Sequence, residues 1–189
     1  RQVQALEGLV GKLKSEVMAD RLRQINPQLK VHVRSEFYNL ESAPGFFLER
    51  PDYVVDAIDA VTCKCHLLSY CRREKIPVVT STGSGGRLDP TQVTVADLAE
   101  TDVDPLAKWI RKFLRRDFGF PGDGEGRFGI PAVYSRELPT DPFELEYDDG
   151  KGFRCVCPKG PGGFLNCEER NLIMGTAGVL SRKWRLEVD

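Results

Sequence analysis

Hydrophobic and polar residues follow one another along the chain with periods that predict helices and strands in turn. Met18, Leu22 and Ile25 recur at helical spacing, so residues 14–26 are predicted to form a helix with one apolar face. Residues 30–36 alternate as a strand does. Further strands are predicted at 53–55, 76–81, 90–98 and 130–137, and further helices at 62–75 and 104–118. This order predicts βαβ units, and therefore an α/β fold with a mostly parallel sheet.

Length and composition define the class of protein that these elements build. The 189 residues are 41% hydrophobic, which is enough for one α/β domain over residues 1–189 with its own core. Residues 139–170 are rich in Pro, Gly and acidic residues, and we expect a loop-rich subregion there. The net charge of -1 excludes a general attraction to nucleic acid or to anionic membranes, so any such contact requires a local patch. No apolar run is long enough to span a bilayer.

The six cysteines bear on the compartment and on metal binding. No pair has C-x-x-C spacing and only two His are present, which argues against a structural zinc site. We therefore expect free thiols in a reducing compartment. Cys155 and Cys157 form a C-x-C pair whose side chains would share one face of a strand. They are candidates for a redox pair or a nucleophile, but nothing nearby would lower a thiol pKa, so a structural role is favoured.

Two carboxylates stand where a buried strand runs into a helix, in the segment "VVDAIDAVTCK". Asp56 and Asp59 lie at the carboxyl end of that strand, which is where open parallel sheets bind ligands. A carboxylate there can hold Mg²⁺ or a ribose hydroxyl. Composition alone favours the other interpretation, in which Asp59 caps the helix that follows. The "STGSGG" segment at residues 81–86 reaches the same edge and could cradle an anion, although a sharp turn is the favoured interpretation.

Basic residues occur at two further places of interest. Lys14 opens a helix, where its charge opposes the helix dipole. This is compatible with a phosphate partner, although a solvated surface lysine is the usual case. The helix 104–118 carries a basic face that could contact RNA or a membrane surface. An ordinary helix docked on a sheet with a solvated outer face is about as well supported as RNA contact. The basic face consists of Lys108, Arg111, Lys112 and Arg115, opposite Trp109, Ile110, Phe113 and Leu114.

Several motifs together resemble the ThiF/MoeB/HesA superfamily of ubiquitin-activating-like adenylating enzymes. The opening "RQ", the "VG..K.E" segment and "INP" are typical of the superfamily. The pattern "DAID…K..L..YCR…IP", followed by "GG..DPTQ" and "D.A.T..DPLA", resembles the branch of ATP-dependent tRNA threonylcarbamoyladenosine dehydratases. The resemblance covers most of residues 1 to about 178. It implies a Rossmann-like fold with a doubly wound sheet. It also implies that the protein acts as a homodimer.

The resemblance also implies roles for individual residues. Arg1 and Gln2 match the end of an Asn-x-x-Arg-Gln motif, in which the Arg contacts ATP phosphates. Lys14 matches the phosphate-binding Lys of the "VG-x-x-K" segment, with Lys12 as a nearby competitor. Asp59 matches the Asp of a D-x-x-D motif that coordinates Mg²⁺ beside ATP, and the first Asp of that motif, Asp56, would shape the turn.

The implied activity is ATP-dependent adenylation of threonylcarbamoyladenosine in tRNA, followed by ring closure with net loss of water. ATP and Mg²⁺ are the implied cofactors, and tRNA is the implied partner. A cysteine desulfurase or sulfur acceptor is a further candidate partner. We expect a cytoplasmic protein, with peripheral membrane attachment or an organellar site as alternatives.

The chain also departs from the pattern of this family. The Gly-rich nucleotide loop, the ribose-binding Asp and the Asn of the Asn-x-x-Arg-Gln motif would precede residue 1, and the apolar C-terminal helices are replaced by "GVLSRKWRLEVD". We therefore expect a domain that lacks its N-terminal nucleotide-loop unit, exposes apolar surface and an unpaired strand edge, and is poorly stable alone.

Other functions stay open at this point. A related enzyme would adenylate the C-terminus of a sulfur-carrier or ubiquitin-like protein, although the two C-x-x-C pairs of its zinc-binding members are absent. A non-catalytic binding or dimerisation module is another alternative. A nicotinamide-dependent dehydrogenase is weaker, because no hydride-site residues are evident.

Overall fold

A computed structural model describes residues 6–9 and 11–140. Its sheet has four strands in the order β1-β2-β4-β3. The strands β1 (Val54–Asp56), β2 (Val78–Ser81) and β4 (Pro131–Ser135) are parallel, and β3 (Val93–Asp97) pairs antiparallel to β4 at the outer edge. The predicted α/β fold with a mostly parallel sheet is therefore confirmed. The four strands match those predicted around residues 53–55, 76–81, 90–98 and 130–137.

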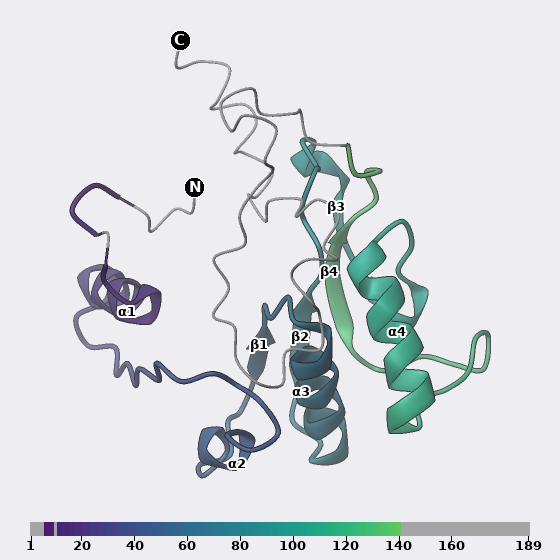
Figure 1. The fold of residues 1–189 in the computed structure, drawn as a ribbon, viewed down its shortest axis with the longest axis horizontal. Helices are drawn as coiled ribbons and strands as arrows, with labels where there is room; N and C mark the ends of the chain where they lie inside the picture. The colour runs from purple at the N-terminus through teal and green to yellow at the C-terminus, as the bar shows by residue number, and fades with distance from the viewer. Residues whose placement is uncertain (1–5, 10, 141–189) are drawn as a thin grey trace, which may run out of the picture.

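Two long helices cover one face of this sheet (Figure 1). Helix α3 (Val61–Arg73) connects β1 to β2 as the crossover of a βαβ unit, and α4 (Pro105–Phe118) packs beside α3. Three further helices in the described part of the chain are short: α2 (Ala43–Phe46), η1 (Pro90–Gln92) and η2 (Leu98–Glu100). The core lies between helices and sheet, and its fully buried apolar side chains include Leu68, Leu98, Ile110, Leu114 and Ala132.

Helix α4 forms where the sequence predicts it because both of its ends carry clear signals. Asp104 accepts a hydrogen bond from the Ala107 backbone at 2.7 Å and caps the helix N-terminus, with Pro105 in the first turn. At the other end, Gly119 adopts the left-handed conformation that glycine permits, with a φ of 65°. Ala107, Ile110 and Leu114 are spaced along one face and are buried against the sheet.

Residues 30–36 were expected to form a strand, and this prediction is wrong. The segment has no regular secondary structure and pairs with no described strand. An alternating pattern produces a strand only where a neighbouring strand accepts its hydrogen bonds, and β1 pairs with β2 alone. The predicted helix at 14–26 is confirmed as α1 (Lys14–Ile25), which lies apart from the sheet in Figure 1.

Apolar side chains are exposed on α1 and on the edge strand, as expected. Met18, Leu22 and Ile25 form the predicted apolar face of α1, yet all three are exposed. Val55 on the edge strand β1 is 76% exposed. Such side chains would normally be covered, so the described residues present apolar surface that is open to association.

This exposure predicts the outcome of a substitution on α1. In the isolated 189-residue chain, Ile25→Gln should change the free energy of unfolding by less than about 0.5 kcal/mol, because Ile25 is already 72% exposed. The same change should reduce the binding of an apolar dye. Urea unfolding and dye fluorescence measure the two effects. A loss of stability as large as that of Leu68→Gln, a fully buried control on α3, would show that the α1 face is packed.

No helix among residues 6–9 and 11–140 has the length and apolar character needed to cross a membrane.

Candidate active site

The carboxyl end of β1 holds a buried carboxylate whose hydrogen-bonding capacity is used within the protein. Asp56 accepts hydrogen bonds from the Ile58 backbone N–H at 3.0 Å and from the Thr80 hydroxyl at 2.7 Å. Its Oδ2 also lies 2.7 Å from Nζ of Lys64, and both side chains of this ion pair are 0% exposed. Asp56 therefore shapes the turn after β1, as the resemblance implied, and its oxygens are not available to a ligand.

Asp59 differs from Asp56 in every one of these respects. It is exposed, lies in the loop between β1 and α3, and makes no hydrogen bond or ion pair with the described residues. The interpretation of Asp59 as a helix cap is wrong, because Ala60 occupies the N-cap position of α3 and no side chain bonds there. The loop residues 57–60 separate the strand from the helix and place Asp59 at the carboxyl edge of the sheet, where its carboxylate has no partner among the described residues.

Lys64 is a site residue that the sequence reasoning missed. Its ammonium group donates to the Ile58 carbonyl at 2.8 Å as well as to Asp56. Burial lowers the pKa of Lys64, and the nearby carboxylate of Asp56 acts against that shift. A signal was present in the sequence: Lys64 shares a helix face with Leu68 and Cys71, both of which are buried. A lysine at a core position requires a buried acidic partner.

One carboxylate at this edge fits Mg²⁺ in the way that nucleotide-dependent enzymes hold it. Mg²⁺ usually takes one or two carboxylates together with substrate phosphates and water, rather than a complete protein cage. Asp59 supplies one free carboxylate, and Asp56 cannot supply a second. The described part of the chain contains no group of three or more His, Cys, Asp or Glu that could hold a metal ion.

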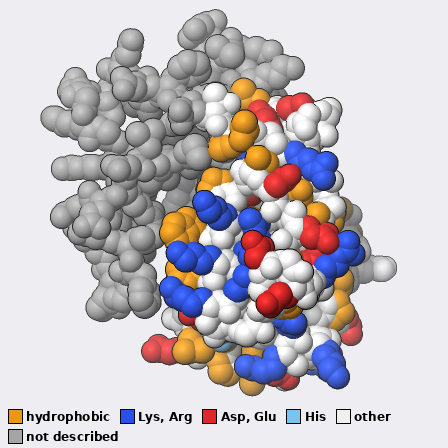
Figure 2. All heavy atoms as spheres, turned by 90° about the vertical axis from the view of Figure 1, so that its right-hand side faces the viewer, with side chains coloured by type: hydrophobic (Ala, Val, Ile, Leu, Met, Phe, Trp, Pro, Cys, Tyr) orange, Lys and Arg blue, Asp and Glu red, His pale blue; other side chains and the backbone are white. Residues whose placement is uncertain are grey.

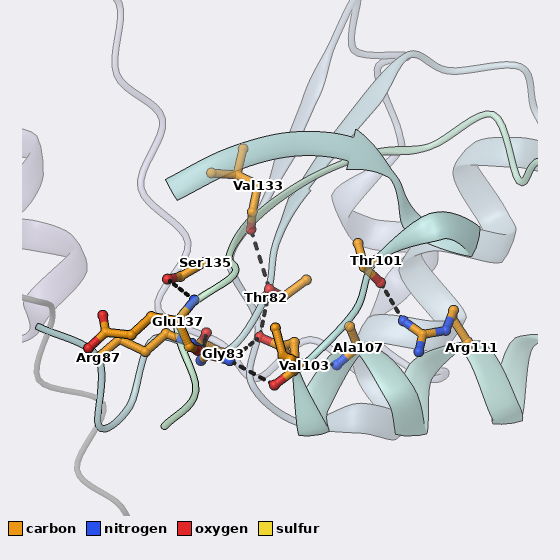
Figure 3. A network of polar contacts seen from close by, with 11 residues as sticks. Thr82, Gly83, Arg87, Thr101, Val103, Ala107, Arg111, Val133, Ser135 and Glu137 are labelled. Carbon is orange, nitrogen blue, oxygen red and sulfur yellow. Dashed lines mark hydrogen bonds and ion pairs between the residues drawn. The ribbon is translucent and has the colours of Figure 1, made fainter. Parts of the chain in front are cut away.

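A second buried ion pair anchors the turn that follows β2 (Figure 3). The Arg87 guanidinium lies 3.4 Å from the Asp104 carboxylate, and both side chains are almost fully buried. Asp104 also accepts a hydrogen bond from the Thr82 hydroxyl at 2.9 Å. The remaining N–H groups of Arg87 donate to the backbone carbonyls of Gly83, Val103 and Glu137. The turn after β2 is thus connected to the N-terminus of α4 and to the end of β4.

The "STGSGG" segment is the sharp turn that its composition favoured. Gly86 has a φ of +73°, and a side chain there would place its Cβ 2.6 Å from the Thr140 carbonyl oxygen. The Glu137 carboxylate accepts hydrogen bonds from the backbone N–H groups of Leu88 and Asp89, each at 2.8 Å. Internal contacts therefore determine the path of this turn at the carboxyl edge of the sheet.

The structure does not bring the other described residues matched to nucleotide binding close to Asp59. Lys14 is exposed at the first turn of α1, and Lys12 is exposed just before it. Because α1 stands apart from the sheet, the structure does not bring Lys14 next to Asp59 (Figure 1). Arg1 and Gln2 lie outside the described residues, as do Cys155 and Cys157.

The basic face of α4 divides into two pairs with different surroundings. Arg111 donates a hydrogen bond to the Thr101 hydroxyl, and Arg115 donates to the Pro121 carbonyl and pairs with Asp123. Lys108 and Lys112 are exposed, and the Lys112 ammonium lies 5.0 Å from the centre of the Trp109 ring. Figure 2 shows Lys and Arg side chains interspersed with Asp and Glu on the side of the molecule that carries α4. Of these four residues, Lys108 and Lys112 make no hydrogen bond or ion pair with the residues that the structure describes.

The described cysteines do not supply a nucleophile. Cys63, Cys65 and Cys71 are free thiols, as expected. Burial raises the pKa of Cys65, and it raises the pKa of Cys71 to about 11. A thiol that stays protonated near neutral pH is a poor nucleophile.

A mostly parallel α/β sheet with a free carboxylate beyond its strand ends is an arrangement that binds nucleotides in many proteins. The chain belongs to the ThiF family, whose sequence profile matches residues 1–182.

Relatives within this family are similar over most of the chain. The tRNA threonylcarbamoyladenosine dehydratase of Escherichia coli is 47% identical over 156 residues, which cover 82% of this chain and 56% of that protein. The protein of the same name in Bacillus subtilis is 36% identical over 194 residues, which cover 100% of this chain and 73% of that protein. A crystal structure of the E. coli dehydratase in complex with ATP has a TM-score of 0.71 and 46% identity, covering 75% of this chain and 58% of that one. The chain thus spans little more than half the length of its E. coli relative.

Proposed function

We propose that the protein containing this chain catalyses the ATP-dependent, cyclising dehydration of threonylcarbamoyladenosine in tRNA. The observation that carries this proposal is the exposed Asp59 carboxylate at the carboxyl edge of a ThiF-family sheet, which has no partner among the described residues. Support comes from the E. coli relative, a tRNA threonylcarbamoyladenosine dehydratase, for which a structure in complex with ATP is known. We expect this reaction in the cytoplasm, where ATP and tRNA are both present.

The reaction proceeds in two steps. The threonylcarbamoyl carboxylate attacks the α-phosphorus of ATP, which forms an acyl-adenylate and releases pyrophosphate. A nucleophile within the same modified nucleoside then attacks the activated carbonyl carbon, which closes a ring and releases AMP. The net change in the nucleoside is the loss of one water. No enzyme nucleophile is needed, because the reacting groups are held within one nucleoside.

Charge stabilisation is the task of the protein in this reaction. Asp59 would hold Mg²⁺, which neutralises the charge on the ATP phosphates. Arg1, Gln2 and Lys14 would bind the phosphates directly, and the two cations would stabilise the charge that develops on the leaving pyrophosphate. The role of Lys14 requires α1 to lie closer to the carboxyl edge of the sheet than it does in this structure (Figure 1). Two copies of the full-length protein would associate as a homodimer.

A product analysis tests this function directly. Full-length protein is incubated with ATP, Mg²⁺ and tRNA that carries threonylcarbamoyladenosine, and the nucleosides are then analysed by mass spectrometry. We expect a product lighter by one water, formed with one AMP and one pyrophosphate. If the tRNA is unchanged while a sulfur-carrier or ubiquitin-like C-terminus is adenylated, the protein acts on a protein partner and the proposal fails.

The exposed lysines of α4 give a prediction about tRNA binding. Replacing Lys108 and Lys112 together by Glu should weaken tRNA binding and lower the slope of log affinity against log salt by about two, because each lysine would neutralise one phosphate. Filter binding over a range of salt concentrations measures both quantities. Arg21→Glu with Lys30→Glu reverses the same number of exposed charges away from α4 and serves as the matched control. Equal affinity and slope in both double variants would mean that α4 is an ordinary solvated surface.

A further inference from the structure

Lys64 and Asp56 together hold both polar groups of the Ile58 backbone. The Asp56 carboxylate accepts from the Ile58 N–H at 3.0 Å, and the Lys64 ammonium donates to the Ile58 carbonyl at 2.8 Å. The Ile58 carbonyl belongs to the peptide group that leads into Asp59. Fixing that peptide plane limits the directions in which the Asp59 backbone can present its side chain.

The ion pair of Lys64 with Asp56 is also held by the neighbouring strand of the sheet. Thr80, on the neighbouring strand β2, donates its hydroxyl to the same carboxylate oxygen of Asp56 that meets Lys64. Thr80 is buried, and in register it lies directly opposite Asp56. The turn that carries Asp59 is therefore held by contacts with two strands and with the first turn of α3, and not by loop contacts alone.

A buried ion pair is weak evidence for a role in stability alone. Lys64 occupies a core position of α3, where an apolar side chain of similar size would normally serve at least as well. Taking both charges out of water is unfavourable unless their geometry and remaining hydrogen bonds are well satisfied. Here they are satisfied: the described residues contain no buried side-chain N or O atom without a partner. Lys64 is 0% exposed and cannot reach a substrate.

We propose that Lys64 is a positioning residue, which acts through Ile58 to hold Asp59 in the orientation that binds Mg²⁺ with ATP. This inference rests on the proposed function, because it assigns Asp59 to the metal. Burial lowers the pKa of Lys64, whereas the charges of Asp56 and then Asp59 act in the opposite direction. Loss of a group that orients a metal ligand without touching the metal typically weakens metal binding by about 10–100-fold.

The test uses Mn²⁺ as a spectroscopic probe for the magnesium site. Free Mn²⁺ is measured by electron paramagnetic resonance in titrations of the full-length protein at saturating ATP. The key variant is the double substitution of Asp56→Asn with Lys64→Met, which removes the bond to the Ile58 carbonyl without leaving a buried charge unpaired. We expect it to fold and to bind Mn²⁺ at least about 10-fold more weakly than the wild type. Asp59→Asn should lose affinity to a similar or greater extent.

Two further variants keep the result interpretable. Thr80→Val removes one hydrogen bond to Asp56 but leaves the ion pair, so it should fold and weaken Mn²⁺ binding by a smaller factor. Cys71→Ala makes a cavity in the core on the same helix and should leave Mn²⁺ affinity unchanged. If Asp59→Asn loses Mn²⁺ while the folded double variant and Thr80→Val bind as the wild type does, the positioning role is overturned and the proposed function stands. If the wild type itself shows no ATP-dependent Mn²⁺ binding, both are overturned.

Discussion

Replacing Asp59 with Asn should lower the rate of ATP-dependent dehydration by the full-length protein by about 100-fold or more. Asn keeps the size of the side chain but removes the charge that would hold Mg²⁺ at the phosphates, and such metal stabilisation contributes several kcal/mol to catalysis. The fold should be unaffected, because Asp59 is exposed and makes no hydrogen bond with the described residues. Calorimetric titration with Mg-ATP and single-turnover kinetics measure binding and chemistry separately.

The matched control for this variant is Asp52→Asn, an exposed carboxylate just before β1 at the opposite end of the strand. It makes the same chemical change near the same strand and should leave both measurements at wild-type values. A wild-type rate in the Asp59 variant, with Mg-ATP affinity unchanged, would remove Asp59 from the metal site.

The largest effect on stability is expected from Asp104→Ala. Asp104 pairs with the buried Arg87, accepts from Thr82 and caps α4. Its removal leaves the Arg87 guanidinium buried without a charged partner, and breaking a buried pair in this way typically destabilises by about 3–5 kcal/mol. Loss of the helix cap adds about 1 kcal/mol. Urea denaturation of the full-length protein, followed by circular dichroism, measures the change.

Asp102→Ala is the control for this prediction. Asp102 lies two residues away, is exposed, and makes no ion pair with the described residues. Its replacement should change the free energy of unfolding by less than about 0.5 kcal/mol. Equal effects of the two substitutions would contradict the network drawn in Figure 3.

Local patterns predicted those parts of the fold whose partners lie nearby in the sequence. Helix α4 carries its own cap, its own apolar face and its own terminating glycine, so its bounds follow from the residues themselves. The strands β1 and β2 are joined through α3, and the βαβ rule brings their carboxyl ends to one edge. For that reason the sequence alone predicts that Asp59 lies at the carboxyl edge of the sheet.

Features that depend on distant partners could not be predicted in the same way. The alternation of residues 30–36 is real, but a strand needs a neighbour, and none is present among the described residues. The ion pair of Arg87 with Asp104 joins residues that no periodicity relates. Helical spacing predicts that the four basic residues of α4 share one side of the helix, but it does not predict that Arg111 and Arg115 are engaged within the protein.

We expect ATP to activate the substrate carboxylate by adenylation, and an isotope experiment tests this step most directly. The threonylcarbamoyl carboxylate of the tRNA is labelled with a heavy oxygen isotope, and the AMP and pyrophosphate formed by the full-length protein are analysed by mass spectrometry. Attack of the carboxylate at the α-phosphorus, followed by ring closure at the acyl carbon, transfers one labelled oxygen to AMP and none to pyrophosphate. Unlabelled AMP formed together with dehydrated tRNA would contradict adenylation and would require a different use of ATP.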